Sequence, residues 1–367
     1  MKVLALASYP VEAAATRYRL TQFVGPLRER GIELDVRPFL NSRLFASLYR
    51  REQLPRTAAG LAASAFRRFA DVARARGADV VLVQREAMMF GPPVVEWLTT
   101  RWGKRPMVLD LDDATYVSYT SPTYGRLGSA LKWFSKTDDL IRWAKIVTCG
   151  NRHIAEYVSG KGARARVIPT VVDTERFRPA VAEPAREGPP VLGWVGTHST
   201  FQYLKAIFPA LQELSRSHRF RLKVVGAGTR EIDLPGVEVE SLDWSMEREI
   251  ADFQSFDVGL YPIVADEWSL GKSGFKAIQY MAVGIPFVVS PVGSCAEIGE
   301  EGRTHLAAAG QGEWAAALGE LLSNEERRRL MGEAGRRHAV EHYTVPIQAD
   351  KLAQALREAA GKNNGGS

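Results

Sequence analysis

Two lysines lie at the start of a predicted helix, in the stretch GKSGFKAIQYMAVGIP at 271–286. Cations are mildly unfavourable at this end of a helix, because the helix dipole is positive there. Glycines, free backbone amides and lysines together suit an anion such as a phosphate. We therefore predict that Lys272 and Lys276 hold an anion, the ordinary alternative being a lysine face exposed to solvent. The residues between the two lysines complete this candidate site: Ser273, Gly274 and Phe275.

Two other strand-to-helix loops have residues that suit phosphate. The first predicted strand leads through small residues into Arg17 and Arg19, and arginines in such a loop can clamp a phosphate or an anionic acceptor. An arginine-bearing helix start without a ligand is the alternative. In the second half of the chain, GWVGTHST at 193–200 places Gly196 and Thr197 where backbone amides can face a phosphate.

Three aspartates follow an apolar strand in PMVLDLDDATY at 106–116. Asp110, Asp112 and Asp113 could together hold a divalent metal, as in a haloacid-dehalogenase-type phosphatase or an Asp-x-Asp transferase. The phosphatase motif, however, requires threonine or valine at the position that Ala114 occupies. We therefore predict that Asp112 and Asp113 contact hydroxyl groups or carry a proton, with a strand-end cap as the alternative.

The elements that must position these residues alternate regularly. Short β-branched runs are separated by helical patterns along the whole chain, which predicts βαβ units and parallel sheets. At 367 residues the chain is long enough for two domains, and the proline-rich stretch 179–190 indicates a linker. Ligands of doubly wound sheets bind beyond the carboxyl ends of the strands. We therefore expect a site in a cleft between two α/β domains.

Composition narrows the class of protein. A hydrophobic content of 46% with 25% charged residues is that of a soluble globular protein, and no apolar run is long enough to span a membrane. Cys149 and Cys295 are far apart in sequence and in apolar or small-residue settings, which predicts two buried thiols in a reducing cytosol. VVGAGTR at 224–230 lacks the third glycine of a dinucleotide fingerprint, which disfavours a nicotinamide-dependent dehydrogenase. HAVEH at 338–342 fits a zinc-protease pattern, but a charged, solvated helix face is favoured.

The net charge of +6 comes from one stretch of the chain. Residues 41–76 contain eight arginines against Glu52 and Asp71, so their excess of six equals the whole net charge. A basic amphipathic segment can lie on an anionic membrane surface. The alternative is a solvated arginine face whose apolar side packs on its own domain. Nucleic-acid binding is disfavoured, because no recognisable nucleic-acid module surrounds the stretch. The apolar residues that interleave with these arginines are Phe45, Leu48 and Tyr49.

These motifs together resemble a GT-B glycosyltransferase of family four, a family of retaining enzymes that transfer a sugar from a nucleotide-diphosphate donor. RVIPTVVDTERFRP at 166–179 resembles that family's interdomain strand and loop, and residues 272–298 resemble its donor-site signature. GWVG and DVGLYP fall in the expected order, and the similarity covers nearly the whole chain. The resemblance implies two Rossmann-like domains, 1–168 for the acceptor and 169–345 for the nucleotide sugar, with a helix at 346–362 crossing back to the first domain.

The resemblance also implies residue roles. The second glutamate of the signature, which binds the donor ribose, falls on Gln279, and the first, which touches the donor sugar, falls on Gly271. Glu297 is expected to hold the donor sugar or nucleotide. The usual arginine and lysine pair after GWVG is not recognisable, so Lys272 and Lys276 are expected to supply that charge.

The expected reaction is retaining transfer to a glycan, a lipid-linked or another hydroxyl acceptor, without a metal, a cofactor or a protein nucleophile. The diphosphate is expected to rest on the two lysines and the Gly196 loop, with Arg17 or Arg19 reaching it. Two alternatives stay open: an inactive sugar-nucleotide-binding protein, and a metal-dependent phosphatase using the three aspartates. We expect the protein in the cytoplasm, in peripheral contact with the inner face of the membrane through its arginine-rich stretch.

Overall fold

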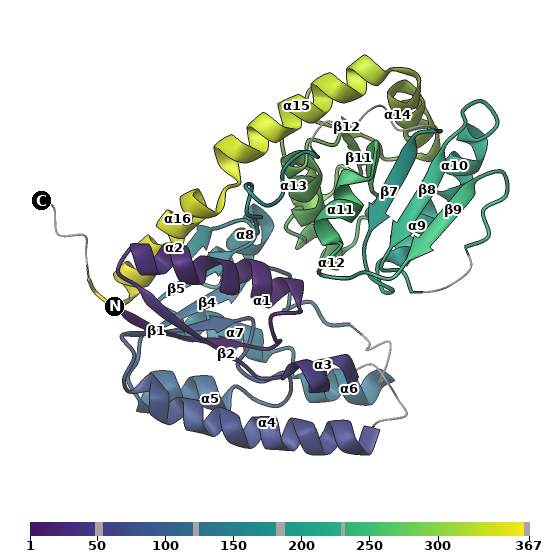
Figure 1. Cartoon of the computed structure of the whole chain (residues 1–367). Coiled ribbons are helices and arrows are strands. Elements are labelled where there is room, and N and C mark those ends of the chain that lie inside the picture. The colour runs from purple at the N-terminus through teal and green to yellow at the C-terminus, as the bar shows by residue number, and fades with distance from the viewer. Residues whose placement is uncertain (48–53, 120–124, 181–187, 229–231, 363–367) are drawn as a thin grey trace, which may run out of the picture. The chain divides into compact units, whose positions relative to one another are not determined.

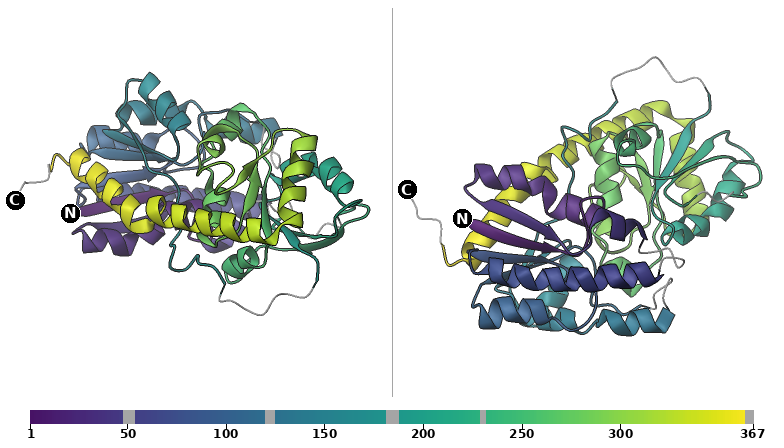
Figure 2. Two further views of the ribbon diagram at one scale, coloured as in Figure 1. Left: turned by 90° about the horizontal axis from the view of Figure 1, so that it is seen from above. Right: turned by 60° about the horizontal axis from the view of Figure 1, so that its bottom comes forward.

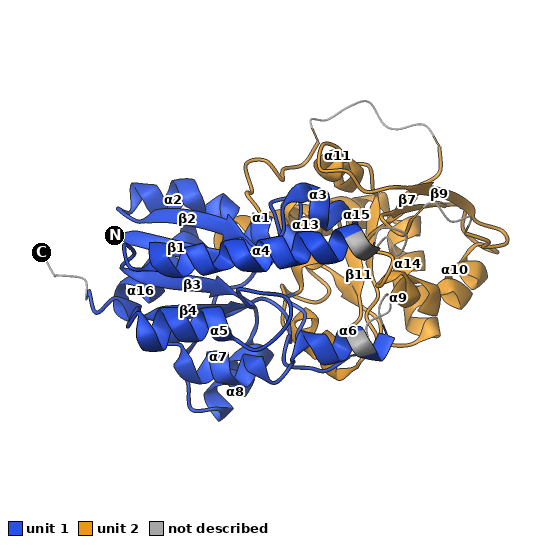
Figure 3. Cartoon of the chain, turned by 90° about the horizontal axis from the view of Figure 1, so that it is seen from below, with its two compact units in different colours: residues 1–170, 271–273, 345–367 blue, residues 171–270, 274–344 orange. Residues whose placement is uncertain are grey.

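A computed structural model describes residues 1–47, 54–119, 125–180, 188–228 and 232–362 (Figure 1). The chain forms two compact units, drawn in blue and orange in Figure 3. Unit 1 combines residues 1–170, 271–273 and 345–367, and unit 2 combines residues 171–270 and 274–344. Unit 1 therefore includes a three-residue segment and a terminal segment that lie far along the chain.

Unit 1 contains a parallel sheet of six strands in the order β2-β1-β3-β4-β5-β6. Every residue of β3, β4 and β5 is buried, because helices cover both faces of this sheet. The order reverses between β1 and β3, and such a reversal opens a crevice at the carboxyl ends of the strands. The strands are β1 (Lys2–Ala7), β2 (Glu33–Pro38), β3 (Val80–Gln84), β4 (Met107–Leu111), β5 (Ile146–Cys149) and β6 (Ala165–Val167).

Helices lie on both faces of the unit 1 sheet, with α2 and α16 on one side and α4 and α5 on the other (Figure 1). Although α16 comes from the end of the chain, it packs on α2, β4 and β5. Met1 and the carboxyl end of α16 lie at the same edge of unit 1 (Figure 2). The helices are α1 (Ala14–Arg19), η1 (Thr21–Phe23), α2 (Val24–Glu29), α3 (Ser42–Ser47), α4 (Leu54–Ala75), α5 (Val94–Trp97), η3 (Leu98–Trp102), α6 (Gly125–Lys132), α7 (Lys136–Trp143), α8 (Arg152–Gly160) and α16 (Val345–Ala359).

Unit 2 contains a second parallel sheet of six strands, in the order β12-β11-β10-β7-β8-β9. Renumbered within the unit this is the dinucleotide-fold order 3-2-1-4-5-6, with its reversal between β7 and β10. The strands are β7 (Val191–Val195), β8 (Arg221–Val225), β9 (Glu238–Leu242), β10 (Val258–Tyr261), β11 (Phe287–Val289) and β12 (Leu306–Ala307). The helices are α9 (Phe201–Ala206), α10 (Phe208–Leu214), α11 (Glu249–Gln254), α12 (Glu267–Leu270), α13 (Phe275–Ala282), η4 (Gly293–Ala296), α14 (Gln311–Ser323) and α15 (Glu325–His342).

The prediction of two doubly wound α/β halves is confirmed, as is the prediction that Cys149 and Cys295 are buried thiols. None of the described helices combines the length and the apolarity that crossing a bilayer requires. Most of the predicted linker, residues 181–187, lies outside the described residues. The ring centres of His338 and His342 lie 4.5 Å apart on α15, with the rings tilted by 56°, and the described residues contain no cluster suited to a metal ion.

Candidate active site

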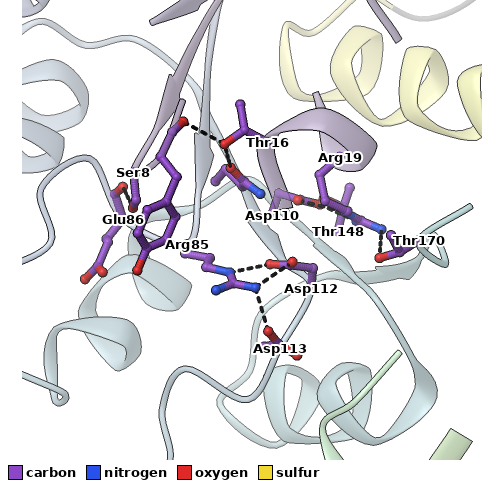
Figure 4. A network of polar contacts seen from close by, with 12 residues as sticks. Ser8, Thr16, Arg19, Arg85, Glu86, Asp110, Asp112, Asp113, Thr148 and Thr170 are labelled. Atoms are coloured by element: carbon purple, nitrogen blue, oxygen red, sulfur yellow. Dashed lines mark hydrogen bonds and ion pairs between the residues drawn. The ribbon is translucent and has the colours of Figure 1, made fainter. Parts of the chain in front are cut away.

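The loops after β1, β3 and β4 bring polar side chains together at the carboxyl edge of the unit 1 sheet (Figure 4). Parallel strands all end at this edge, so residues distant in sequence become neighbours there. Two arginine–aspartate groups dominate the network. One consists of Arg19 and Asp110, and the other joins Arg85 to Asp112 and Asp113.

Arg19 lies inside unit 1 and is neutralised by Asp110. Its Nε donates to Asp110 Oδ2 at 3.0 Å, its Nη2 donates to Oδ1, and its Nη1 donates to the Ile168 carbonyl at 2.6 Å. Thr148 Oγ1 donates to the same carboxylate at 2.6 Å. The side chains of Arg19 and Asp110 are only 3% and 5% exposed. Burial opposes the charge on Arg19, but Asp110 outweighs it and raises the arginine pKa.

This geometry corrects the prediction that Arg19 contacts a phosphate. A phosphate ligand needs an accessible cation, whereas Arg19 is buried and its charge is already paired. It instead fastens α1 to β4 and to the segment after β6. Arg17 is half-buried on the same helix, and its Nη1 donates to the Glu12 carbonyl at 3.0 Å while its guanidinium covers the Tyr18 ring at 4.7 Å.

Arg85 is the central residue that the sequence did not reveal. Its Nε and Nη2 donate to the two carboxylate oxygens of Asp112 at 2.6 and 2.7 Å, and Nη2 also donates to Asp113 Oδ2 at 2.6 Å. The residue directly follows β3 and has a left-handed φ of 61°. A non-glycine residue in that region is strained, and such strain is often found at functional sites. The only hint in the sequence was a cation directly after a buried strand.

The neighbouring residue explains how this conformation is held. Glu86 is buried and forms ion pairs with Lys132 and with Lys136, whose Nζ lies 2.7 Å from the carboxylate. Its backbone carbonyl accepts a hydrogen bond from Ser8 Oγ at 2.9 Å. Burial opposes ionisation of Glu86, but the two lysines outweigh it and lower its pKa. The loop after β3 is thereby fastened at the residue that follows Arg85.

The pKa values of Asp112 and Asp113 are shifted in opposite directions. Burial disfavours the charge on Asp112, but the fork of Arg85 and the charge of Arg19 outweigh it and lower the pKa. For Asp113, lost solvation and the neighbouring Asp112 outweigh Arg85 and Lys272, so its pKa is raised. The Asp113 side chain is 28% exposed, against 8% for Asp112. Of the two predicted aspartates, Asp113 therefore has the raised pKa and the more exposed carboxylate.

Part of the lysine loop belongs to this cluster. The Lys272 carbonyl accepts a hydrogen bond from Asn151 Nδ2 at 2.9 Å, and the charge of Lys272 acts on Asp113. Gly271 lies so close to Ala114 that an added Cβ would come within 2.3 Å of the alanine Cβ. A side chain such as glutamate therefore does not fit at 271 in this arrangement. Ser273 lies in the same segment of unit 1.

The prediction placed both lysines on one helix start, whereas the structure groups them with different units. Helix α13 begins at Phe275, after Gly274, whose φ of 67° suits glycine. Lys276 Nζ donates to Gln279 Oε1 at 3.0 Å and lies 5.3 Å from the centre of the Phe253 ring. Of the two lysines in the predicted site, unit 2 therefore contains Lys276, in the first turn of α13.

Helix α13 is anchored at the strand-order reversal of unit 2. Tyr280 Oη donates to the carbonyls of Gly193 on β7 and Leu260 on β10, each at 3.1 Å. Gly193 on β7 and Gly259 on β10 lack room for a side chain. A Cβ at Gly193 would meet the Phe256 ring, and a Cβ at Gly259 would meet the Tyr280 ring. Because α13 follows β10 and leads to β11, its amino end lies at the carboxyl edge of the sheet.

The loop after β7 differs from the prediction. The amide of Gly196 donates to the Val225 carbonyl at 3.0 Å, and that of Thr197 donates to Thr200 Oγ1 at 2.9 Å. Both amides predicted to face a phosphate are thus already paired, that of Gly196 with strand β8 and that of Thr197 within the loop. The exposed Thr197 hydroxyl lies 2.9 Å from Ser199 Oγ.

Glu297 is exposed and follows η4, near the start of α13. A Cβ added at Gly274 would lie 3.5 Å from Ser294 Oγ and 3.0 Å from Ile298 Cδ1, which places η4 beside the amino end of that helix. Of the residues predicted to bind the donor, unit 2 therefore gathers Gly274, Phe275, Lys276, Gln279 and Glu297.

The folds of both units match known glycosyltransferase structures. A glycosyltransferase from Rickettsia africae ESF-5 superposes with a TM-score of 0.71 at 13% identity, over 99% of each chain. Sucrose-phosphate synthase from Thermosynechococcus elongatus gives 0.68 at 14% identity, over 98% of this chain and 99% of that one. Anabaena HepE in complex with UDP-glucose gives 0.66 at 16% identity, over 98% of this chain and 100% of that one. The chain therefore has the GT-B fold.

One family match comes from the sequence of unit 2. Residues 189–324 match the family Glycosyl transferases group 1. The chain is 26% identical over 242 residues to a D-inositol 3-phosphate glycosyltransferase of Nocardia farcinica, covering 58% of this chain and 52% of that one. A protein of the same name from Corynebacterium jeikeium is 27% identical over 221 residues, covering 53% and 51%. The match thus spans about half the length of these relatives.

Proposed function

We propose that this protein is a retaining glycosyltransferase that moves a sugar from a nucleotide-diphosphate sugar to a hydroxyl group of a glycan or lipid-linked acceptor. The observation that carries the proposal is the Lys276–Gln279 pair, on a helix whose amino end lies at the strand-order reversal of unit 2. The family match to the same unit supports it, as do fold relatives whose structures contain UDP or UDP-glucose.

We place the nucleotide-sugar donor on unit 2. Gln279 is fully buried, and its Nε2 finds no acceptor among the described residues. A buried donor without a partner costs about 1–3 kcal/mol, and a ribose hydroxyl that accepts from Nε2 would relieve this cost once the first turn of α13 moves to admit it. Lys276 and the first amides of α13 would then face the diphosphate, and Glu297 the sugar. In this proposal Gln279 and Gly271 mark a variant of the family's two-glutamate motif.

We place the acceptor hydroxyl against the aspartates of unit 1. Arg85 keeps Asp112 ionised, while Asp113 has a raised pKa and an exposed edge. As the acceptor oxygen bonds to the anomeric carbon, the bond from that carbon to the diphosphate breaks and Asp113 takes the hydroxyl proton. The diphosphate leaves with the electron pair of the broken bond. Fixed cations lower the barrier where they bind the leaving group more tightly than the ground state, and one such group is worth about 3 kcal/mol.

The metal-dependent phosphatase is disfavoured by the geometry of its three aspartates. Arg19 pairs with both carboxylate oxygens of Asp110, and Arg85 pairs with both oxygens of Asp112 and with one of Asp113, so arginines occupy five of the six oxygens that would bind the metal. The inactive sugar-nucleotide-binding protein shares the donor site of our proposal. Donor binding without transfer to any acceptor would favour that alternative.

The proposal includes peripheral contact with the anionic inner face of the cytoplasmic membrane. A lipid-linked acceptor would be presented at that surface, and basic segments near such a surface gain about 1 kcal/mol per arginine. Support comes from the exposed arginines of α4, which are Arg56, Arg67 and Arg74.

A thermal-shift screen against UDP-, GDP-, ADP- and TDP-sugars tests the proposed donor. A ligand that binds only the folded protein at 100 times its Kd adds about 2.7 kcal/mol of stability. We expect one nucleotide class to raise the melting temperature by several degrees, and the Lys276→Ala variant to lose most of this rise. The control is Lys205→Ala, which removes an exposed lysine of unit 2 on α9. Equal melting with and without every donor would contradict a donor site.

The pH dependence of transfer should report on Asp113. Because its pKa is raised, we expect kcat/KM to fall as the pH drops through a range above the ordinary aspartate value, where the carboxylate becomes protonated. In Asp113→Asn, kcat should fall by about 10²–10⁴-fold and this acid limb should disappear. Stability is a poorer readout: the raised pKa of Asp113 costs stability as the pH rises, whereas the lowered pKa of Asp112 adds it. An unchanged acid limb in the variant would rule out Asp113 as the proton acceptor.

A further inference from the structure

The solvent-facing side of α4 is unusually apolar. The buried side of the helix contains Arg68, Asp71 and Val72, and its outer side has no acidic residue from 56 to 75. Phe66 is 82% exposed and Phe69 is 45% exposed. The exposed residues of this helix are Arg56, Ala58, Ala59, Ala62, Ala63, Phe66, Arg67, Phe69, Ala70, Ala73 and Arg74.

A second row of aromatic and basic residues lies next to this helix. Helix α4 packs on α5 and η3, and Figure 3 shows α4 at the front of unit 1 with α5 beside it. Trp97 and Trp102 are 47% and 60% exposed, and the Arg76 guanidinium lies 4.9 Å from the Trp102 ring. Glu96, the acid of this segment, is buried. The exposed residues of the row are Val94, Trp97, Arg101, Trp102 and Lys104.

We propose that these two rows, the α4–η3 face, bind the surface of an anionic phospholipid bilayer. The phenylalanines, tryptophans and alanines would enter the interfacial layer, and the arginines would pair with lipid phosphates. Helices that lie in this layer combine an apolar face containing Phe or Trp with arginine or lysine at its border. Tryptophan suits the interface because its ring is apolar and its N–H is polar.

The charge pattern favours a membrane over a second copy of the chain. In a two-fold dimer the same patch meets itself, so Arg67 and Arg74 of one copy would face cations of the other. An anionic bilayer instead offers phosphates to every arginine on the face. The inference rests on the membrane contact in the proposed function, and it does not depend on the transfer chemistry.

The proposed membrane contact involves different residues from those that the sequence indicated. Phe45 packs on the unit 1 core and lies 5.7 Å from the Tyr9 ring, so it is not free to insert. Arg68 is buried and donates to three backbone carbonyls, and it therefore cannot bind lipid. Leu48, Tyr49, Arg50 and Arg51 lie outside the described residues.

Co-sedimentation of the full chain with vesicles tests the α4–η3 face. We expect binding to phosphatidylcholine vesicles that contain 30% phosphatidylglycerol, and at least tenfold weaker binding to pure phosphatidylcholine or in 0.5 M salt. Two double variants should each weaken binding at least tenfold: Phe66→Ser with Trp102→Ser, and Arg67→Glu with Arg101→Glu. The matched controls change exposed residues of unit 2: Leu330→Ser with Met246→Ser, and Arg216→Glu with Arg219→Glu.

Three outcomes would overturn the inference: no binding to the anionic vesicles, equal loss in the control variants, or face variants that change only the oligomeric state measured by sedimentation. Donor-induced thermal shifts, measured without vesicles, separate this inference from the donor site. Face variants that keep the shift but lose vesicle binding support a membrane surface. A protein that binds vesicles but shifts with no donor would retain the membrane surface and lose the proposed donor site.

Discussion

Lys276→Met is expected to lower kcat/KM for sugar transfer by about 10²–10³-fold, the loss seen when one preorganised charge-stabilising group is removed from an active site. Methionine keeps an apolar stem against Phe253 but removes the ammonium group that would face the departing diphosphate. The loss should appear in kcat, because the leaving group gains negative charge only as its bond to the sugar breaks. Lys276→Arg keeps a cation and should recover part of the rate.

The control for this variant is Lys205→Met, on the exposed side of α9 in the same unit. It should transfer sugar at the rate of the unaltered protein. Without donor, Lys205→Met should melt like the unaltered protein, whereas Lys276→Met should melt at a lower temperature because the buried Gln279 Oε1 loses its hydrogen bond from Nζ. The rates are therefore compared at a temperature where all variants are folded. If Lys276→Met turns over normally, the diphosphate is held elsewhere and the donor site has been misplaced.

Arg19→Met should reduce the free energy of unfolding by about 3–5 kcal/mol, because it leaves the Asp110 carboxylate buried without its partner. The double variant Arg19→Met with Asp110→Leu should recover most of that loss, since well-packed apolar residues can replace a buried ion pair at little cost. Urea unfolding measures both changes in free energy, provided that the variants share the m-value of the unaltered protein.

Activity distinguishes this structural role from the phosphate contact that the sequence indicated. Measured where each variant is fully folded, the transfer rate of the double variant should stay within a few-fold of the unaltered protein. Arg85→Lys should behave differently, losing the bidentate fork on Asp112 and changing the pH profile of transfer. A stable Arg19→Met protein that no longer transfers sugar would show that Arg19 contacts the substrate after all.

The sequence predicted the fold because its signal is local and repeated. Runs such as VVLVQ and MVLDL are apolar throughout, which indicates strands covered on both faces, and each is followed by a helical pattern. The aspartates after β4 could be placed at a strand end for the same reason. What the pattern could not supply was the partner of each charge, since Arg19 and Asp110 are 91 residues apart.

The phosphate-binding amides of the β7 loop failed as a prediction for a related reason. GWVGTHST has the composition of an anion-binding turn, but whether its amides are open depends on which acceptors the folded loop supplies. Thr200 Oγ1 accepts from the Thr197 amide, and the Val225 carbonyl, on a neighbouring strand, accepts from the Gly196 amide. Composition determines which donors exist, and packing determines which of them remain available.

The sequence by itself determined the two parallel α/β halves, the strand-end positions of the aspartates and the basic character of residues 41–76, because periodicity and composition act over short distances along the chain. Only the tertiary structure decided that Arg19 is a buried counter-ion, that strained Arg85 joins Asp112 to Asp113, and that the two lysines of GKSGFK belong to different units. It also decided which side chains of α4 face outward. The physical reason is common to all of these: pairing, burial and exposure are settled by neighbours in space, and the folded sheets bring those neighbours from distant parts of the chain.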